Sequence, residues 1–314
     1  MTIFPSFILK DTNSPHKNAQ YEYTFLMRKR LIFFLSFLYF FPAFFGCQRV
    51  HAPSKSEIST KLEDLHSPQI VLPAAPPEAD KEDFWDLSDV DISYIQPTRK
   101  LIAFTFDDAP KNTLENILAV FADYNEQNPD CKATATVFCN GRYITPSSRH
   151  ALEAAVAMNF ELGNHTYTHY DLTTLDKEHL FSEIDRTDQL LQAIDHKPLH
   201  LLRPPYGQCN PFIQKNVRTP IINWTIDTLD WTNVSESYVY DTIMQNCYNG
   251  CIVLMHDGYH NTVNALKALL PALKREGYQV VGVSAMAKAN ACPLKNGSEY
   301  IRARPKSPNR VRVE

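Results

Sequence analysis

Two aspartates stand side by side in the sequence FTFDDAP, directly after an apolar run and directly before a proline. Asp and Pro both favour turns, so one interpretation is a simple turn at the end of a strand. The other is a site in which Asp107 and Asp108 have different roles, one taking a proton and the other binding a metal ion. Partners elsewhere in the chain decide between these interpretations.

Two histidines four residues apart, His165 and His169 in the sequence HTYTH, are candidate partners. On a helical turn this spacing places both rings on one face, about 5–6 Å apart at Cβ, which suits two ligands of one metal ion. An isolated pair of this kind is more common at a surface or a helix cap. A nearby carboxylate changes this interpretation, because a His, His, Asp set leaves open coordination for water, as catalytic zinc sites do.

Other polar motifs follow further apolar runs. RPPYG spans Arg203 to Gly207, DTLDW contains Asp230 and Trp231, and LMHDG contains His256. In barrels of parallel strands, the carboxyl ends of the strands carry the chemistry. We therefore expect these motifs to meet the aspartates and histidines at one rim.

Short apolar runs alternate with helical patterns from about residue 100 to residue 290. In the first helical pattern Leu114, Ile117, Leu118 and Phe121 share one face, after a capping pair of Asn112 and Glu115. The alternation predicts an α/β fold with a parallel sheet, closed into a (β/α)7-type barrel that buries both faces. The expected strands span residues 101–106, 133–139, 160–165, 199–203, 220–226, 251–256 and 278–283. Two further helical faces contain Leu180, Ile184, Leu191 and Ile194, and Leu266, Leu269, Leu270 and Leu273, with Pro271 expected to kink the latter helix.

The motifs TFDDAP, HTYTH, RPPYG, DTLDW and IVLMHDG, in this order and spacing, resemble those of the polysaccharide deacetylases with the NodB homology domain, carbohydrate esterase family 4. The resemblance covers roughly residues 100 to 288. It implies a distorted (β/α) barrel, a divalent metal ion, and removal of N-acetyl groups from amino sugars, usually in chitin-like or peptidoglycan chains. Zinc is the expected ion, with cobalt, nickel or manganese as alternatives.

The resemblance also implies roles for individual residues. Asp107 would be the general base, and Asp108 would bind the metal ion together with His165 and His169. Amide hydrolysis at neutral pH needs a strong nucleophile, which a metal ion supplies by lowering the pKa of bound water. Asp107 would remove the proton as that water attacks the acetyl carbonyl, and Arg203 would pair with and position Asp107.

The remaining motifs would stabilise the charges that develop in the reaction. The backbone N–H of Tyr206 would help to bind the carbonyl oxygen as it becomes negative. His256 would protonate the leaving nitrogen, because the ordinary pKa of an imidazole lies near the working pH. Asp230 would hold His256 and favour its charged form, with Asp227 as a rival for this role.

Several of these residues have other interpretations. Trp231 and Leu254 would wall the pocket for the acetyl methyl group, or they could be core residues. Tyr206 could be a turn residue after two prolines, and Arg203 could form a surface ion pair. The family usually has glycine where this chain has Ala109. Ala109 therefore either adopts an ordinary backbone conformation or narrows the site by one methyl group.

The N-terminal region contains a candidate export signal at residues 27–47, MRKRLIFFLSFLYFFPAFFGC, which has a basic start, an apolar stretch and a small residue before a cysteine. The apolar stretch is shorter than the roughly 20 residues that span a bilayer, so a permanent transmembrane helix is the alternative. FFGC resembles a loose lipoprotein cleavage box in which Cys47 would be lipidated. Residues 1–26 would be an untranslated or disordered leader, with translation starting at Met27. The protein is therefore expected outside the cytoplasmic membrane and anchored to it.

Three segments are expected after the signal. Residues 48–98, rich in Pro, Ser, Glu and Lys, predict a disordered tether, although FWDLSDVDISYI at its end could pack on the domain as an edge element. Residues 99–290 would form the deacetylase-type domain, and residues 291–314 a basic, flexible tail. Six cysteines follow Cys47, an even number that suits disulfides in an exported chain, but the sequence does not choose among their pairings.

The net charge of −4 argues against a general nucleic-acid-binding protein. The sequence favours a metal-dependent N-deacetylase of an amino-sugar polysaccharide, either peptidoglycan of the cell envelope or a chitin-like polymer. A hydrolase of a non-sugar amide and a catalytically silent carbohydrate-binding barrel are the alternatives. The complete set of candidate catalytic residues argues against the silent barrel.

Overall fold

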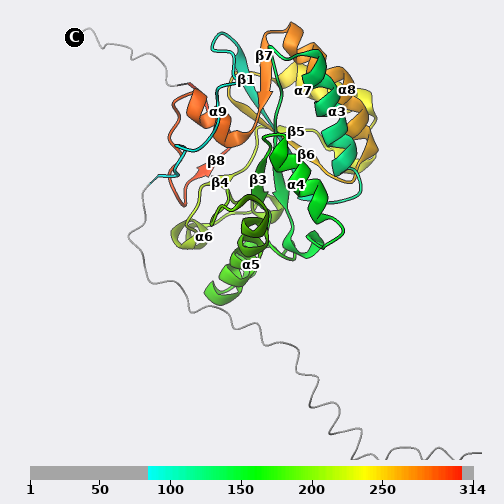
Figure 1. Cartoon of the computed structure of the whole chain (residues 1–314). Helices are drawn as coiled ribbons and strands as arrows, with labels where there is room; N and C mark the ends of the chain where they lie inside the picture. Colours follow the sequence, from blue (N-terminus) through cyan, green and yellow to red (C-terminus); the bar gives the residue numbers. More distant parts are fainter. Residues whose placement is uncertain (1–83, 306–314) are drawn as a thin grey trace, which may run out of the picture. The chain divides into compact units, whose positions relative to one another are not determined.

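The computed structural model describes residues 84–305, and a parallel β-sheet runs through their centre (Figure 1). Its strands are β1 (Lys100–Ala109), β2 (Thr136–Cys139), β3 (Glu161–Asn164), β5 (Ile226–Asp227), β6 (Cys251–His256) and β7 (Tyr278–Val281). They are hydrogen-bonded in the order β3-β2-β1-β6-β5. Strand β1 has β6 on one side, and on the other side β7 pairs with its first half and β2 with its second half. The chain therefore places β1, which carries the two aspartates, at the centre.

Beyond β3 the sheet continues through single bridges. Leu202 pairs in parallel with Asn164 of β3 and with Ile221 of β4 (Ile221–Ile222). The chain then passes from β4 to β5 through residues 223–225. This path curves the sheet into a distorted barrel, and it confirms the predicted α/β barrel class.

Strands β2, β3 and β7 are each shorter than the sequence predicts, and two other expected strands differ more strongly from the prediction. The run at 199–203 keeps only the bridge at Leu202, because Pro204 and Pro205 follow it and lack the N–H donors that a ladder needs. The run at 220–226 divides into β4 and β5, because Ile222 donates its N–H to Leu202 whereas Ile226 pairs with β6. Each half of this run therefore belongs to a different neighbour.

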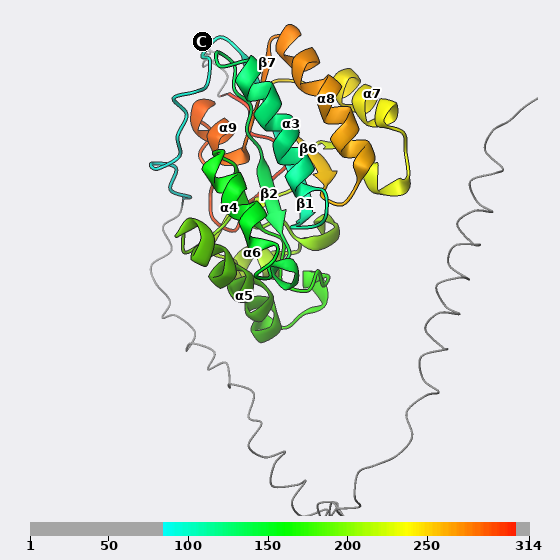
Figure 2. The same ribbon diagram turned by 45° about the vertical axis from the view of Figure 1, so that its right-hand side comes forward.

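Helices surround the sheet within residues 84–305. In Figure 2, α3, α8 and α7 lie side by side, and contacts between α7 and α8 and between α3 and α8 agree with this view. Helix α8 continues through Pro271. The helices are α3 (Leu114–Gln127), α4 (Arg149–Ala157), α5 (Lys177–Asp195), α6 (Pro211–Asn216), α7 (Glu236–Asn246), α8 (His260–Arg275) and α9 (Val283–Ala289).

Alternate residues of β1 face two different apolar clusters. Phe104 and Phe106 pack in the cluster between the sheet and helices α3, α7 and α8. Leu101 and Ala103 pack in a second cluster, which contains residues of β2, β4, β6 and β7 and fills the barrel interior. Side chains alternate along a strand, so Asp107 continues the second series. It therefore points inward at the rim of the barrel.

The start of α3 differs from the prediction of a cap at Asn112. The N-cap is Thr113, and its side chain does not cap the helix. Instead Asp257, which follows β6, accepts hydrogen bonds at Oδ1 from the Thr113 N–H (3.1 Å) and hydroxyl (2.6 Å). A carboxylate that is distant in sequence thus replaces the local capping pair at the positive end of the helix.

Both segments that flank the predicted domain are partly packed against it. Trp85 donates its N–H to the carbonyl of Leu294 (2.7 Å), and β8 (Glu299–Tyr300) pairs with β4. The prediction of a disordered tether is therefore wrong for residues 84–95. Most apolar side chains of this segment pack on the barrel-interior cluster, as the edge-element alternative expected. The flexible tail is wrong for residues 294–303, where Leu294 and Ala303 are buried.

Several predictions concern residues outside the described range. The leader, the signal at residues 27–47 with Cys47, and most of the tether fall there. Within residues 84–305, no helix is long and apolar enough to cross a membrane. No disulfide joins any two of the six cysteines in this range, so none of the pairings that their even number allows is present there.

His200 lies buried between two aspartates at the end of α5. Its Nδ1 is 2.9 Å from Asp188 Oδ1, and its Nε2 is 3.2 Å from Asp195 Oδ1. Burial alone would lower the pKa of His200, but hydrogen bonds and charge attraction from the two carboxylates outweigh it and raise the pKa to about 9. The charged ring therefore stabilises the fold up to alkaline pH.

This raised pKa predicts how stability depends on pH. The contribution of charged His200 is complete below the unfolded-state pKa of about 6.5 and is lost as pH rises through about 9. His200→Gln should lower the free energy of unfolding at both pH values. We expect this loss to be about 3 kcal/mol smaller at pH 10 than at pH 6, because His200 is neutral at pH 10. Urea unfolding of both proteins at the two pH values measures this difference. An equal loss at both pH values would contradict a charged His200.

Candidate metal and catalytic site

The ends of β1 and β3 bring three potential metal ligands together. Asp108, His165 and His169 offer ligand atoms that all lie within 4.8 Å of one another. Asp108 Oδ1 is 3.8 Å from His165 Nε2 and 3.5 Å from His169 Nε2. Ligands about 2.0–2.2 Å from one tetrahedral zinc ion lie about 3.4 Å from each other. The three side chains therefore fit a single divalent ion with further coordination positions left for water or substrate.

The contacts of these ligands orient them. His165 Nδ1 donates a hydrogen bond to the carbonyl oxygen of Arg203 (2.7 Å), which leaves Nε2 as the free ring nitrogen. Lys111 Nζ bonds Asp108 Oδ2 (3.0 Å), so the other oxygen, Oδ1, faces the histidines. Ring orientation and carboxylate orientation are thus both fixed by residues that are not ligands.

The charges around the ligands keep them in the forms that bind metal. Burial raises the pKa of Asp108, but the charges of His165 and Lys111 outweigh burial, so the net pKa lies below its ordinary value. Burial and the neighbouring His165 lower the pKa of His169. A deprotonated carboxylate and a neutral imidazole are the forms in which these side chains coordinate a metal ion.

Asp107 is buried and paired with Arg203. Arg203 Nη1 donates to Asp107 Oδ1 (2.7 Å) and to Thr105 Oγ1 (2.6 Å), and Nε donates to the carbonyl of Ile222 (2.9 Å). Arg203 is fully buried, and its guanidinium lies 4.1 Å from the ring centroid of Phe138. Burial lowers the pKa of Arg203, and Asp107 opposes this effect. The surface ion pair considered for Arg203 is therefore wrong, and a simple turn does not account for the buried Asp107.

His256 and Asp230 form a second pair beside Asp107. His256 is the register neighbour of Asp107 across β6 and β1. Its Nδ1 donates to Asp230 Oδ1 (2.7 Å), and its backbone N–H donates to Asp230 Oδ2 (2.8 Å). Burial would lower the pKa of His256, but the hydrogen bond and charge of Asp230 outweigh it and raise the pKa. The rival Asp227 instead accepts the N–H of Leu229 (2.9 Å).

The other predicted site residues lie around these two pairs. Tyr206 has a left-handed backbone (φ 60°) and a largely exposed ring 4.8 Å from the ring of His169. Trp231 is 52% exposed directly after Asp230, so the core interpretation is wrong for it. Leu254 is buried on β6 two residues before His256, which places both side chains on one face of the strand.

Ala109 adopts an ordinary backbone conformation, the first of the two alternatives that the sequence left open. The left-handed conformation falls on the preceding residue, Asp108 (φ 65°), and Ala109 is not among the residues with positive φ. Its side chain is fully buried in the cluster between the sheet and helices α3, α7 and α8, away from the barrel interior. The methyl group that distinguishes Ala109 from glycine therefore requires no unusual backbone conformation.

Three supporting residues were missed by the sequence reasoning. Lys111 stands three residues after Asp108, and Thr105 stands two residues before Asp107 on the same face of β1, so spacing alone could have indicated both. Thr262 donates its hydroxyl to Asp230 Oδ2 (2.6 Å). It lies 32 residues along the chain from Asp230, and nothing in the sequence marks that contact.

Comparisons with known proteins match this arrangement. A family model described as polysaccharide deacetylase matches residues 95–220. The peptidoglycan-N-acetylglucosamine deacetylase of Bacillus cereus is 31% identical over 198 residues, which is 60% of this chain and 89% of that protein. The solved structure of peptidoglycan deacetylase PdaC from Bacillus subtilis has a TM-score of 0.58 and 28% identity, and the match covers 63% of this chain and 94% of that one.

Other relatives are considerably longer than the matched region. The bifunctional xylanase/deacetylase of Pseudobutyrivibrio xylanivorans is 31% identical over 189 residues, which is 59% of this chain but 30% of that protein. The curated PdaC sequence is likewise covered over 39% of its length. The chain thus spans less than half the length of these relatives, and the likeness concerns one domain of each.

The family model, the near-complete coverage of the Bacillus cereus protein and the matching fold agree with one another. They also agree with the motifs at the carboxyl ends of the strands. The chain belongs to the polysaccharide deacetylases of carbohydrate esterase family 4.

Proposed function

We propose that this protein is a metal-dependent hydrolase that removes N-acetyl groups from the amino sugars of a polysaccharide. The observation that carries the proposal is the convergence at one rim of a candidate ion site with two hydrogen-bonded pairs, Asp107 with Arg203 and His256 with Asp230. An acid and a base on opposite sides of one bond are what amide hydrolysis requires.

Asp108, His165 and His169 would hold the ion, for which we propose zinc because two imidazoles and a carboxylate are typical of catalytic zinc sites. A bound divalent ion supplies a water molecule of lowered pKa and polarises the acetyl carbonyl. Asp107 takes the proton of the attacking water, and Arg203 keeps its carboxylate in place. The N–H of Tyr206 stabilises the carbonyl oxygen as it becomes negative.

His256 completes the reaction by protonating the sugar nitrogen as the C–N bond breaks, because an amine does not leave as an anion. Asp230 holds the imidazole ring through Nδ1, which leaves Nε2 to give the proton. Trp231 and Leu254 bound the space for the acetyl methyl group. The products are acetate and a free amino sugar.

Peptidoglycan is the substrate that we propose, since the Bacillus cereus and Bacillus subtilis relatives carry peptidoglycan deacetylase names. The basic and apolar pattern of residues 27–47 supports export and anchoring outside the cytoplasmic membrane, where this polymer lies. A chitin-like polymer is the alternative substrate, and the same site would act on it by the same steps.

Acetate release tests the proposed reaction. The purified whole chain, stripped of metal and reloaded with zinc, cobalt or nickel, is incubated with isolated peptidoglycan and with chitin oligosaccharides. We expect metal-dependent acetate release from peptidoglycan, because the site combines an ion site with a base and an acid. A folded protein that binds one metal ion and releases no acetate from either substrate would refute the deacetylase proposal.

Asp107→Asn and His165→Ala separate the base from the metal ligands. We expect Asp107→Asn to bind zinc normally and to lose about 10²- to 10⁴-fold in kcat, the range for a general base. His165→Ala should lose both zinc binding and turnover, because it removes a ligand. Calorimetric zinc titration and acetate release measure the two properties. Near-normal turnover of Asp107→Asn would show that another group is the base.

The pH profile tests the pair of His256 and Asp230. His256 acts as an acid only while protonated, so activity should fall as pH rises through its pKa. Asp230 raises that pKa, and Asp230→Asn should therefore move the alkaline limb of kcat to lower pH. Asp227→Asn is the matched control, because Asp227 does not bond His256. Equal profiles for Asp230→Asn and the control would contradict the role of Asp230.

A further inference from the structure

The loop that carries both candidate histidine ligands has an uncommon backbone conformation. Thr166 (φ 65°) and His169 (φ 67°) are left-handed, although neither is glycine, asparagine or aspartate. Such conformations cost free energy and persist only where surrounding contacts impose them. The orientation of the His165 and His169 rings therefore depends on whatever holds residues 165–169.

One side of this loop is held through its carbonyl groups. Asn140 Nδ2 donates to the carbonyl of His165 (2.6 Å), the Gly141 N–H donates to that of Thr166 (3.0 Å), and the Arg142 N–H donates to that of Tyr167 (3.0 Å). These three donors belong to the chain directly after β2. They leave the N–H groups of the loop to be satisfied from elsewhere.

Helix α5 satisfies one of these groups, the Thr168 N–H, through Glu183. The carboxylate accepts the Thr168 N–H at Oε2 (2.7 Å) and the Thr168 hydroxyl at Oε1 (2.7 Å). Glu183 is only 8% exposed, and no cation is its partner in these contacts. Burying a carboxylate is costly unless it is hydrogen-bonded. Both Glu183 oxygens are therefore committed to the residue next to His169.

Asp188 supports the other end of the loop from the same helix. Its Oδ1 accepts Asn164 Nδ2 (2.8 Å), and the Oδ1 of Asn164 in turn accepts the Thr166 N–H (2.9 Å). Asp188 is 3% exposed and Asn164 fully buried. The relay from Asp188 through Asn164 thus ends at the left-handed Thr166, directly after His165.

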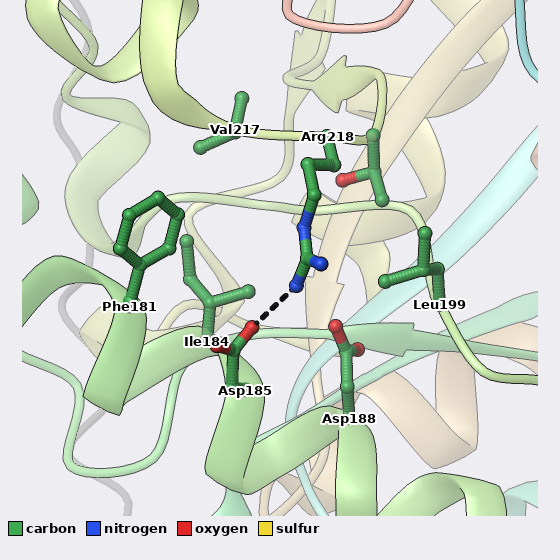
Figure 3. A pocket seen from close by; sticks show the side chains of 8 residues that line it. Phe181, Ile184, Asp185, Asp188, Leu199, Val217 and Arg218 are labelled. Carbon is green, nitrogen blue, oxygen red and sulfur yellow. Dashed lines mark hydrogen bonds and ion pairs between the residues drawn. The ribbon is translucent and has the colours of Figure 1, made fainter. Parts of the chain in front are cut away.

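Another carboxylate of α5, Asp185, has a different partner, as Figure 3 shows. Asp185 reaches across to Arg218 and pairs with it (2.8 Å), while Asp188 stands beside it in the same pocket. That pocket contains none of the predicted site residues. Asp185 therefore offers a matched comparison, a carboxylate of the same helix that does not bond the loop.

We propose that Glu183 and Asp188 are positioning residues that hold the loop of residues 165–169 in its left-handed conformation and so aim both histidine rings at Asp108. The proposal rests on the proposed metal site. Groups that orient metal ligands contribute strongly to affinity, and changing one typically weakens metal binding about 10- to 100-fold. Here the orienting groups act through the backbone on both sides of the ligand pair.

Zinc titration of the metal-free whole chain tests this role without any substrate. We expect Glu183→Ala to weaken zinc binding about 10- to 100-fold, because the loop loses two hydrogen bonds next to His169. Glu183→Gln should bind zinc nearly as wild type does. Its amide oxygen can accept the Thr168 N–H, and its amide nitrogen can donate to the Thr168 hydroxyl.

Controls separate positioning from general stability. Asp185→Ala removes a carboxylate of the same helix and should leave the zinc dissociation constant unchanged. If Glu183→Ala does not fold, Thr168→Val removes the hydroxyl contact alone and should still weaken zinc binding. Unchanged zinc affinity in folded Glu183→Ala or Thr168→Val would overturn the positioning role while leaving the deacetylase proposal intact. A wild-type chain that binds no zinc would refute the metal site and the positioning role together.

Discussion

The buried guanidinium of Arg203 is the group on which the rest of the site depends. It bonds Asp107 and Thr105 on β1 and the carbonyl of Ile222 on β4, so it connects strands on different sides of the barrel. Its own carbonyl oxygen accepts the hydrogen bond of His165 Nδ1. A buried charge without its partner is strongly destabilising. Asp107, the candidate ligand His165 and the barrel interior are therefore tied to one ion pair.

In the proposed reaction, the two pairs at the rim would give neighbouring residues opposite chemical tasks. Asp107 and His256 are register neighbours on β1 and β6, yet a cation holds the aspartate and an anion holds the histidine. Environments that differ in this way separate a base from an acid in many hydrolases. In this chain the separation follows from the parallel register, which places Arg203 and Asp230 at the ends of different strands.

The sequence could predict that the site residues meet at one rim, because this follows from local patterns, whereas the two pairings were implied by the resemblance to the deacetylase family. Apolar runs that end in polar motifs place Asp107, Asp108, His165 and His256 at one rim once the strands are parallel. Other contacts between segments that are distant in sequence have no local pattern that predicts them. The bridge at Leu202 and the cap of α3 by a distant carboxylate depend on tertiary structure and were missed. The packing of residues 84–95 was expected only as the alternative to a disordered tether.

Backbone strain at the rim shows why the supporting residues were hidden from sequence reasoning. Asp108, Thr166, His169 and Tyr206 are all left-handed, although none is glycine. A sequence pattern for positive φ would search for glycine and would find none at these four positions. In the histidine loop, hydrogen bonds hold the backbone instead, from Glu183, which is distant in sequence, and from Asp188 through the neighbouring Asn164. The candidate site is therefore shaped by its surroundings, and its strain is maintained by groups that take no part in the chemistry.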